Sequence, residues 1–410
     1  MIPPVRTFDP YSPDVQRDPY RHWAALRDTA AVVQTTLDGR HVYVLSRDRD
    51  VRAALADWRT FSSKGGLSLH PRDRLQAGVL VATDPARPDE PRTHADHTEL
   101  VRVVAPYMSR RAIAAMAPHI RAVVDKVVGD LVAAGGFDAV ADLARPIPVQ
   151  VISDLVGLPE EGRERYADWA RTATALQGPQ AAFPADAFTQ IQQMQEYVTR
   201  LGVDHRFAPG TVGAAVFAAA SEHARISHEE ATSVVWGGLI VAGLHTTIAA
   251  LGWTLWVAAR HPDQWLLYRQ RHREGDDTRR AWTDELLRYE SVFPHGYRTT
   301  TTPVVVDGYV IPADARVLLL YGSANRDPRR WQDPDRFLLT RPDVGTHLGF
   351  GAGVHYCLGQ HLVRLEMQAV LDAFADHGVA AFEVGEGEFE ANAAVRGWSK
   401  LPVTVVTDHR

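Results

Sequence analysis

The sequence predicts a mainly α-helical protein with a small β portion, folded as a single domain over residues 1–410. Helical patterns dominate from about residue 98 to residue 290. One apolar stretch within them, near residues 227–262, is long enough to cross a whole domain. Strand-like runs are short, and they lie near the N-terminus, at 301–320 and at the C-terminus. Since no repeat or Gly/Ser-rich linker interrupts the chain, we expect one helical core with a minor sheet.

The composition narrows the class of protein. Hydrophobic residues make up 45% of the chain, which is enough for a packed core. A formal net charge of −6 provides no basic field of the kind that binds nucleic acid. The single cysteine cannot form an intrachain disulfide, and the N-terminal stretch contains no apolar signal segment. We therefore expect a cytoplasmic protein that binds neither nucleic acid nor a membrane.

The elements of the N-terminal third can be assigned in order. "HVYVLS", residues 41–46, alternates and contains β-formers, which predicts a strand, and residues 47–58 predict a helix. Residues 64–95 are rich in glycine, proline and charge and predict a long loop. Because loops of that length in compact domains usually serve a function, this loop is a candidate for the site. Residues 110–136 are amphipathic and end in two glycines, as helices often do.

The apolar stretch near residues 227–262, "SHEEATSVVWGGLIVAGLHTTIAALGWTLWVAARHP", is the most informative helix. Ser227 and Glu230 form a capping box at its start, and Pro262 follows its end. At about 1.5 Å per residue it runs on the order of 50 Å. It is apolar almost all round but is interrupted by glycines, a histidine and tryptophans. These features indicate a buried central helix rather than a membrane span.

The only cysteine, Cys357, lies in "HLGFGAGVHYCLGQHL", residues 347–362, at the start of a helical pattern. A cysteine at a helix N-terminus meets free N–H groups and the positive end of the helix dipole, which favour the thiolate. Gly351 and Gly353 permit a tight turn against a flat or anionic group, and Gly359 leaves space beside the sulfur. Taken alone, however, an isolated cysteine of this kind is more often a buried, inert thiol.

The whole motif decides between these interpretations, because it resembles the haem-binding loop of the bacterial cytochrome P450 family. The residues that carry the resemblance are Phe350, Gly351, Gly353, His355, Cys357 and Gly359. In that family the cysteine thiolate is the proximal ligand of the haem iron and donates electron density to it. The resemblance implies a cytochrome P450 fold with the long helix over the haem. It also implies haem b (iron protoporphyrin IX) as cofactor and Cys357 as the iron ligand.

The same resemblance assigns other residues to cofactor binding. Phe350 packs near the sulfur, and the N–H groups of the loop tune its charge by hydrogen bonding. His355 and the arginine of "YRTT", Arg298, are expected at the haem propionates. In "HTELVR" the family's propionate histidine corresponds to His97, but Val101 stands in the place of the arginine that usually follows it. Arg102 is next along the chain, about 100° further round the helix, and whether it substitutes is left open.

A structural cluster is implied by two further motifs. "ELLR" places Glu285 and Arg288 one helical turn apart and resembles the family's Glu-Arg pair. Arg341, after "DPDRF", corresponds to the arginine that completes this triad. The triad is expected to hold the segment that leads to the cysteine loop.

The largest departure from the family lies in "AGLHTT", residues 242–247. Thr246 matches the family's oxygen-activating threonine, but His245 stands where the family has an acid. Gly243 weakens the helix there, so a local bulge is expected. In one interpretation His245 relays protons, and in the other it is a satisfied core histidine with no catalytic share. A catalytic His245 would favour hydrogen peroxide as the oxygen source, which gives a peroxygenase as the alternative to a monooxygenase.

The expected substrate is a small-to-medium, largely apolar or aromatic molecule. The motifs are most similar to those of bacterial enzymes that hydroxylate or O-demethylate small aromatic acids and phenols. Gly237 and Gly238 lie where such enzymes can carry polar anchors, which argues against a tight carboxylate clamp and widens the pocket. The residues expected at the pocket are Leu239, Ala242, Phe293, His295, Phe183, Lys64, Ser68 and Trp398.

The resemblance implies a monooxygenase that receives electrons from a separate ferredoxin and an NAD(P)H-dependent ferredoxin reductase, and that is a monomer. The chain contains no cysteines for an iron–sulfur cluster. Arginines expected on the cysteine-side surface are possible docking residues for an acidic partner: Arg110, Arg111, Arg329, Arg330 and Arg364. A non-catalytic haem sensor is a third interpretation, and Thr246 counts against it.

Overall fold

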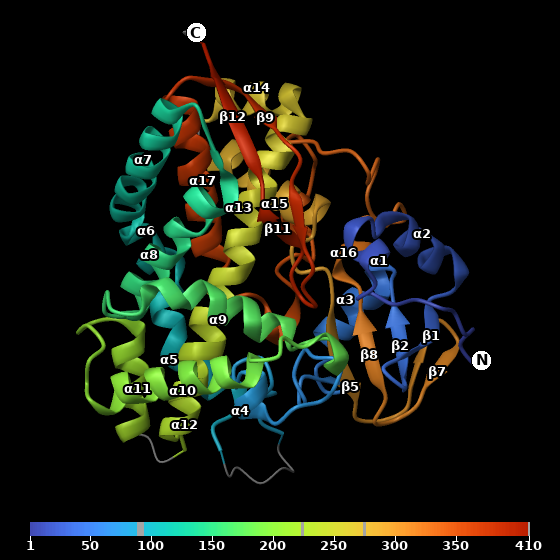
Figure 1. The fold of residues 1–410 in the computed structure, drawn as a ribbon. Coiled ribbons are helices and arrows are strands. Elements are labelled where there is room, and N and C mark those ends of the chain that lie inside the picture. The colour runs from blue at the N-terminus through green and yellow to red at the C-terminus, as the bar shows by residue number, and fades with distance from the viewer. Residues whose placement is uncertain (88–93, 223–224, 274–275, 409–410) are drawn as a thin grey trace.

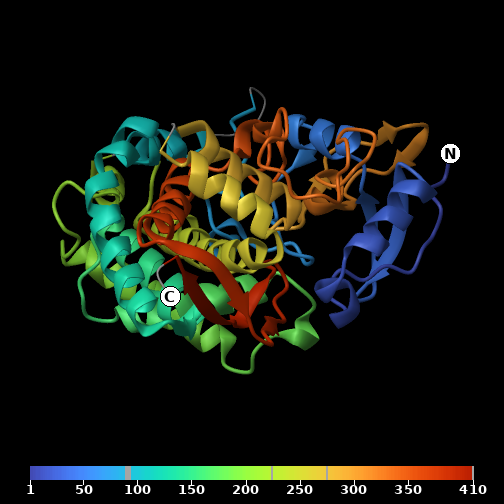
Figure 2. The same cartoon turned by 90° about the horizontal axis from the view of Figure 1, so that it is seen from above.

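A β-rich portion and a larger helical portion lie side by side in the computed structural model, which describes residues 1–87, 94–222, 225–273 and 276–408. The N-terminal strands lie at one side of the molecule, and the helices that follow them in sequence form the other side (Figures 1 and 2). The predicted mainly α architecture with a small β portion is confirmed.

The helices form most of the framework. Their bounds are α1 (Pro13–Arg17), α2 (Tyr20–Thr29), α3 (Asp48–Ala56), α4 (Arg74–Ala77), α5 (His97–Met108), α6 (Arg110–Ala115), α7 (Ala117–Ala134), η1 (Ala139–Ala144), α8 (Pro146–Val156), α9 (Arg163–Ala175), η2 (Gln180–Ala182), α10 (Ala187–Val203), α11 (Val212–Glu222), α12 (His228–Ser233), η3 (Val234–Val241), α13 (Ala242–Arg260), α14 (Pro262–Arg271), α15 (Asp276–Tyr289), α16 (Tyr321–Ala324), η4 (Val344–Thr346), η5 (Gly353–His355) and α17 (Gln360–Asp376).

The strands of the described residues form four small sheets. Their bounds are β1 (Val32–Leu37), β2 (Arg40–Leu45), β3 (Phe61–Ser62), β4 (Gly136–Asp138), β5 (Gly296–Thr300), β6 (Val304–Val306), β7 (Tyr309–Ile311), β8 (Arg316–Leu319), β9 (Val379–Val384), β10 (Glu388–Glu390), β11 (Gly397–Lys400) and β12 (Pro402–Thr407). The largest sheet has the order β1-β2-β8-β5-β3, and only its β2–β8 pair is parallel. A second sheet has the order β4-β12-β9, and two hairpins, β6–β7 and β10–β11, complete the set.

Most of the expected elements are present. The strand at 41–46 and the helix at 47–58 correspond to β2 and α3. The helix predicted for 110–136 is divided into α6 and α7 at Met116, because Pro118 starts a new helix. Gly135 caps α7 in the left-handed conformation, as its position predicted.

The central helix consists of α12, η3 and α13, which run without a break from His228 to Arg260. Ser227 and Glu230 form the predicted capping box. The π-helical turns of η3 end at Val241, directly before the segment where a bulge was expected. The helix is long and apolar enough to cross a membrane, but its most apolar window is 72% buried inside the protein. It therefore has the character of a core helix, and Figure 1 shows α13 in the middle of the helical portion.

The segment predicted as a long loop, residues 64–95, packs against the central helix, although its residues 88–93 lie outside the described part of the chain. The short helix α4 lies in this segment. Ser233 of the central helix receives a hydrogen bond from the N–H of Val79 and donates one to the carbonyl of Leu75. A Cβ at Gly237 would lie 3.1 Å from Cα of Gly78. Gly237 therefore allows the loop to pack closely against the central helix, in addition to any widening of the pocket.

Candidate active site

A cavity of about 500 Å³ lies between the central helix and the cysteine loop. Thr246 and Ala242 of α13 line it, as do Cys357 and Gly359 at the start of α17. Loop residues 67–81 and helix α10 also contribute to its wall. The cavity thus brings together the two motifs that the sequence singled out, although more than 100 residues separate them.

The backbone around Cys357 directs its sulfur into this cavity. The N–H of Cys357 donates to the carbonyl of Phe350 at 3.0 Å, which closes the loop that contains Gly351 and Gly353. The sulfur accepts hydrogen bonds from the N–H groups of Gly359 and Gln360. Burial raises the pKa of the Cys357 thiol, and these N–H groups act in the opposite direction. The loop therefore supplies donors to a sulfur that is otherwise poorly solvated.

Phe350 is buried and lines the cavity beside the cysteine. The guanidinium carbon of Arg364 lies 4.5 Å from the centre of its ring. Arg364 also donates to Asp284 at 2.8 Å, and it is only 5% exposed. The expectation that Arg364 is a surface docking residue is therefore wrong, because a carboxylate and an aromatic ring bury it beneath the loop.

Three buried cationic or imidazole groups line the cavity and fit the carboxylates of an acidic cofactor. Nδ1 of His97 and Nε2 of His355 are buried and have no hydrogen-bond partner among the described residues. Arg298 is buried and donates to the carbonyl of Tyr297 at 2.8 Å. Buried polar atoms are normally satisfied, so these groups indicate a missing acceptor. The residues therefore fit the propionates of the expected haem.

The two imidazoles contact each other at a tilt of 55° with ring centres 4.3 Å apart, and Nε2 of His97 contacts the carbonyl of Val354 at 3.0 Å. Burial lowers the pKa of His97, and it lowers the pKa of His355 to about 4. Nε2 of His355 lies 3.7 Å from Oδ1 of Asp84, a carboxylate that the sequence analysis did not single out. Arg102 is exposed and does not line the cavity, so the structure gives it no contact that replaces the arginine missing at position 101.

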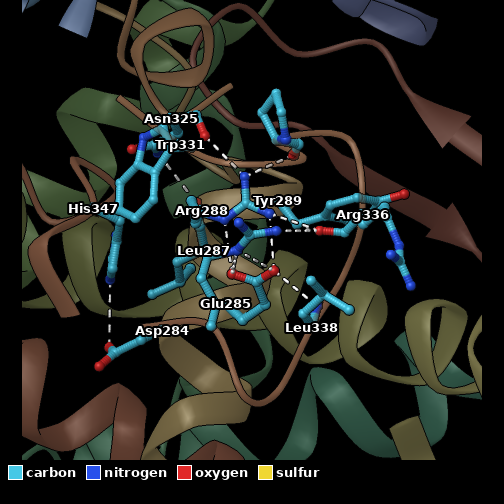
Figure 3. Close-up of polar contacts among 12 residues, drawn as sticks. Asp284, Glu285, Leu287, Arg288, Tyr289, Asn325, Trp331, Arg336, Leu338 and His347 are labelled. Atoms are coloured by element: carbon cyan, nitrogen blue, oxygen red, sulfur yellow. Dashed lines mark hydrogen bonds and ion pairs between the residues drawn. The ribbon is translucent and has the colours of Figure 1, made fainter. Parts of the chain in front are cut away.

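Glu285, Arg288 and Arg341 meet in a buried cluster, and Figure 3 shows the side chains of Glu285 and Arg288 facing each other. Arg288 binds both carboxylate oxygens of Glu285, at 2.7 and 2.8 Å, and Nε of Arg341 lies 3.0 Å from each of them. Arg288 also donates to the carbonyls of Asn325 and Arg336. The cluster thus ties α15 to the chain between residues 325 and 341, which leads to the cysteine loop.

On the opposite side of the cavity, Thr246 and His245 point in different directions. Thr246 lines the cavity, and its hydroxyl donates to the carbonyl of Ala242 at 2.7 Å. His245 is buried and is not among the lining residues. Its Nδ1 lies 2.6 Å from Oγ1 of Thr174, and its Nε2 lies 3.0 Å from Oε2 of Glu390. The histidine is therefore held in a polar network behind the cavity wall.

The residues predicted for the substrate pocket fall into two groups. Those that line the cavity are Leu239, Ala242, Phe293 and Ser68. Those that the structure does not bring to the lining are His295, Phe183, Lys64 and Trp398.

The second group packs elsewhere. His295 meets Tyr11 edge to face, with ring centres 5.8 Å apart, and Phe183 contacts Phe188, which itself lines the cavity. Trp398 packs at 5.1 Å against Trp253 of the central helix. Lys64 interacts with another group of the protein, and its side chain is not among those that line the cavity.

Sequence reasoning missed the polar end of the cavity. Arg72 lines it, donates to the carbonyl of Leu176 at 2.9 Å and lies 5.4 Å from the ring centre of Phe183. Burial lowers the pKa of Arg72, and no acidic group of the described residues opposes that effect. Glutamines accompany it in the lining: Gln76, Gln177, Gln192 and Gln195. These residues come from three separate segments, so only the fold reveals that they converge.

Comparisons with known proteins agree with this geometry. A family model described as cytochrome P450 matches residues 280–376. Cytochrome P450 CYP199A2 of Rhodopseudomonas palustris is 36% identical over 403 residues, which cover 97% of this chain and 93% of that protein. Cytochrome P450 monooxygenase PikC of Streptomyces venezuelae is 32% identical over 416 residues, with 98% and 94% covered. The structure of CYP109Q5 from Chondromyces apiculatus is 27% identical with a TM-score of 0.81, covering 98% of this chain and 99% of that one.

The chain belongs to the cytochrome P450 family. It has the single-domain cytochrome P450 fold and is a haem-iron monooxygenase, an oxidoreductase that acts on small organic molecules with electrons from redox partners. The family resemblance inferred from the cysteine loop is thereby confirmed.

Proposed function

We propose that the protein is a haem-thiolate monooxygenase that hydroxylates or O-dealkylates a small-to-medium apolar or aromatic substrate, with Cys357 as the ligand of haem b. The observation that carries this proposal is the placement of Cys357 and Thr246 on one cavity. His97, His355 and Arg298 would hold the propionates, since all three are buried or nearly buried in the cavity lining and Nδ1 of His97 and Nε2 of His355 make no hydrogen bond within 3.5 Å among the described residues. When bound, the haem iron supplies the oxygen-activating chemistry.

The lining supports a substrate with an apolar body and a polar end. Leu239, Ala242 and Phe293 provide apolar surface near the predicted cofactor position. Arg72 and the glutamines provide donors elsewhere in the same cavity. A half-buried guanidinium without an acidic partner stabilises a carboxylate or phenolate by charge-assisted hydrogen bonds. Aromatic acids and phenols are therefore the substrates that we place first.

We further propose a cytoplasmic monomer that receives electrons from a ferredoxin and its NAD(P)H-dependent reductase. Arg110 and Arg111 are exposed at the start of α6. Arg329 and Arg330 are also partly exposed, and Arg329 pairs with Asp28 and Asp327. These arginines provide the basic surface that an acidic ferredoxin would require.

A peroxide-driven reaction is the second candidate. It was suggested by His245 in the place of the family's acid, with the histidine as base or anchor for the peroxide. Because His245 is not among the cavity-lining residues and both ring nitrogens have partners, it would have to act through Thr174. We therefore place the reductase-driven reaction first.

The test is a carbon monoxide difference spectrum of the reduced protein, followed by ligand titrations. Wild-type protein should give a thiolate-type Soret band, and Cys357→Ser should lose it while it retains the fold. Aromatic acids, phenols, fatty acids and terpenoids are then compared by their spin-state shifts and by product formation with ferredoxin and reductase or with hydrogen peroxide. A wild-type spectrum without the thiolate band would refute the proposal. Turnover with peroxide alone would replace the first candidate by the second.

A further inference from the structure

Glu390 occupies an unexpected place beside the central helix. It lies on β10, 145 residues after His245, yet its Oε2 is 3.0 Å from Nε2 of that histidine. His245 is only 3% exposed. The carboxylate of Glu390 thus lies next to position 245, where the central helix carries a histidine instead of an acid.

The hairpin holds Glu390 firmly in this position. Phe389, the preceding residue, packs against Trp253 of α13 and against Trp398 of β11, with ring centres 6.4 and 5.9 Å apart. Nε1 of Trp253 donates to the carbonyl of Arg396 at 2.8 Å. Because aromatic contacts and a hydrogen bond fix the hairpin to the central helix, Glu390 is preorganised toward His245.

The outer end of this network approaches solvent. The side chain of Glu390 is 13% exposed, and its Oε1 lies 4.0 Å from Nε of Arg171, whose side chain is 55% exposed. Glu390 of β10 thus contacts both His245 and Arg171 of α9. A proton from water can therefore reach Glu390 without crossing the core.

The inner end is Thr174, which is among the residues that line the cavity. Its Oγ1 lies 2.6 Å from Nδ1 of His245 and 2.9 Å from the carbonyl of Arg171, and Nδ2 of Asn392 donates to it at 3.2 Å. When His245 is neutral with its proton on Nε2, the hydroxyl donates to Nδ1. When His245 is protonated, Nδ1–H donates to Oγ1, and the hydroxyl can turn to the carbonyl or to the cavity. Both protonation states are fully hydrogen-bonded.

We propose that Glu390, His245 and Thr174 form a proton-entry path into the cavity, in which Glu390 replaces the acid that the central helix lacks. This inference rests on the proposed monooxygenase function, whose reaction consumes two protons for each oxygen molecule reduced. A proton that Glu390 has taken from water binds Nε2 of His245, and the Nδ1–H bond breaks as a new O–H bond forms on Thr174. Thr174 in turn releases its original hydroxyl proton toward the cavity, so that each group regains its starting charge. A half-turn of the imidazole ring then restores the tautomer with its proton on Nδ1.

Glu390 acts on the cavity through His245 and is therefore a positioning residue. Glu390→Gln retains a hydrogen-bonding side chain of similar shape but cannot carry a proton. Glu388→Gln is the matched control, because Glu388 lies on the same strand, is 68% exposed and faces Lys400 at 3.9 Å. The first measurement is the ¹⁵N NMR spectrum of the His245 ring in the reduced, carbon monoxide-bound protein, with His245→Ala to assign the signals.

We expect Glu390→Gln to move the Nε2 signal of His245, because the hydrogen-bond partner of that nitrogen changes from a carboxylate to an amide. Glu388→Gln should leave the signal unchanged. An unchanged Nε2 signal in Glu390→Gln would overturn the pairing, whether or not the protein turns over substrate. This readout thus separates failure of the inference from failure of the proposed function.

The second measurement is the fraction of reducing equivalents recovered as product, together with its solvent deuterium isotope effect. In Glu390→Gln and in Thr174→Val, which conserves side-chain shape, the fraction should fall several-fold and the isotope effect should change, because each variant interrupts proton transfer. Glu388→Gln should match the wild type in both quantities. Values for Glu390→Gln and Thr174→Val that match the wild type would overturn the path.

Discussion

The carbonyl oxygen of Leu55 lies where a side chain at Gly353 would begin: a Cβ added there would be 2.3 Å away from it. Leu55 belongs to α3 in the N-terminal portion, whereas Gly353 belongs to the turn before Cys357. The contact thus fixes the cysteine loop against a helix almost 300 residues earlier in the chain. This contact requires a residue without a side chain at position 353. Gly351 makes no comparably close approach to another part of the chain.

Gly353→Ala should destabilise the protein more than Gly351→Ala does. Both glycines are left-handed, with φ of +71° and +70°, so alanine meets the same backbone strain of roughly 1–2 kcal/mol at either position. Only position 353 adds a backbone clash, because the nearest atom to a Cβ at position 351 is 3.8 Å away. Chemical denaturation and haem content should show the difference. Equal losses in the two variants would contradict the close approach.

Arg288→Met should cost about 3–5 kcal/mol or prevent folding, because it leaves Glu285 with a single cation and several carbonyls without a donor. Arg288 and Glu285 are both fully buried. Arg280→Met on the same helix is the control, since Arg280 pairs with Asp284 at 3.2 Å but is 56% exposed. We expect that control to cost less than about 1 kcal/mol. Similar urea midpoints for the two variants would show that the burial of the arginine does not determine the loss of stability.

The sequence alone predicted those features whose residues lie close together along the chain. The cysteine loop, the capping box at Ser227 and the glycine cap of α7 depend on residues a few positions apart, and the structure contains all three. The pair of Glu285 and Arg288 is local in the same sense. Arg341 was assigned only by its place in a family motif, yet it contacts the same carboxylate.

The other features of the site could not be predicted from the sequence, because they depend on contacts between residues far apart in the chain. Glu390 approaches His245 only because the C-terminal hairpin folds back onto α13, and no local pattern marks it. Arg72 lies in a segment predicted as a loop, and the sequence analysis did not single it out. Its side chain is oriented by contacts with distant residues such as Leu176, which no local pattern reveals. Trp398 was expected at the pocket, but an aromatic cluster on the central helix holds it instead.

Arg72→Gln should weaken the binding of aromatic carboxylic acids by about 10–100-fold, which corresponds to roughly 1.5–3 kcal/mol for a charged hydrogen bond. Binding of the methyl ester of the same acid should change little, because the ester has no charge for Arg72 to stabilise. The ester also controls for the lost contact between Arg72 and the carbonyl of Leu176. Spin-state titrations measure both ligands. An equal loss for acid and ester would assign Arg72 to loop structure instead of ligand binding.

Glu366→Gln should stabilise the protein increasingly as the pH rises from about 5 to 8. Glu366 lies on α17 below the cavity, is fully buried, and neither carboxylate oxygen has a hydrogen-bond partner among the described residues. Burial raises the pKa of Glu366 to about 8. The unfolded chain loses this proton near pH 4.5, whereas the folded protein retains it up to about pH 8. Between these values the native carboxyl makes folding less favourable by roughly 1.4 kcal/mol for each pH unit, and glutamine removes that slope.

The difference in unfolding free energy between Glu366→Gln and the wild type should therefore widen with pH and level off above about pH 8. Urea unfolding at a series of pH values measures it. Glu388→Gln serves as the control, because Glu388 is largely exposed and should contribute no slope in this range. A difference that stays constant from pH 5 to 8 would mean that the folded protein holds Glu366 ionised. In that case a polar partner must satisfy its carboxylate.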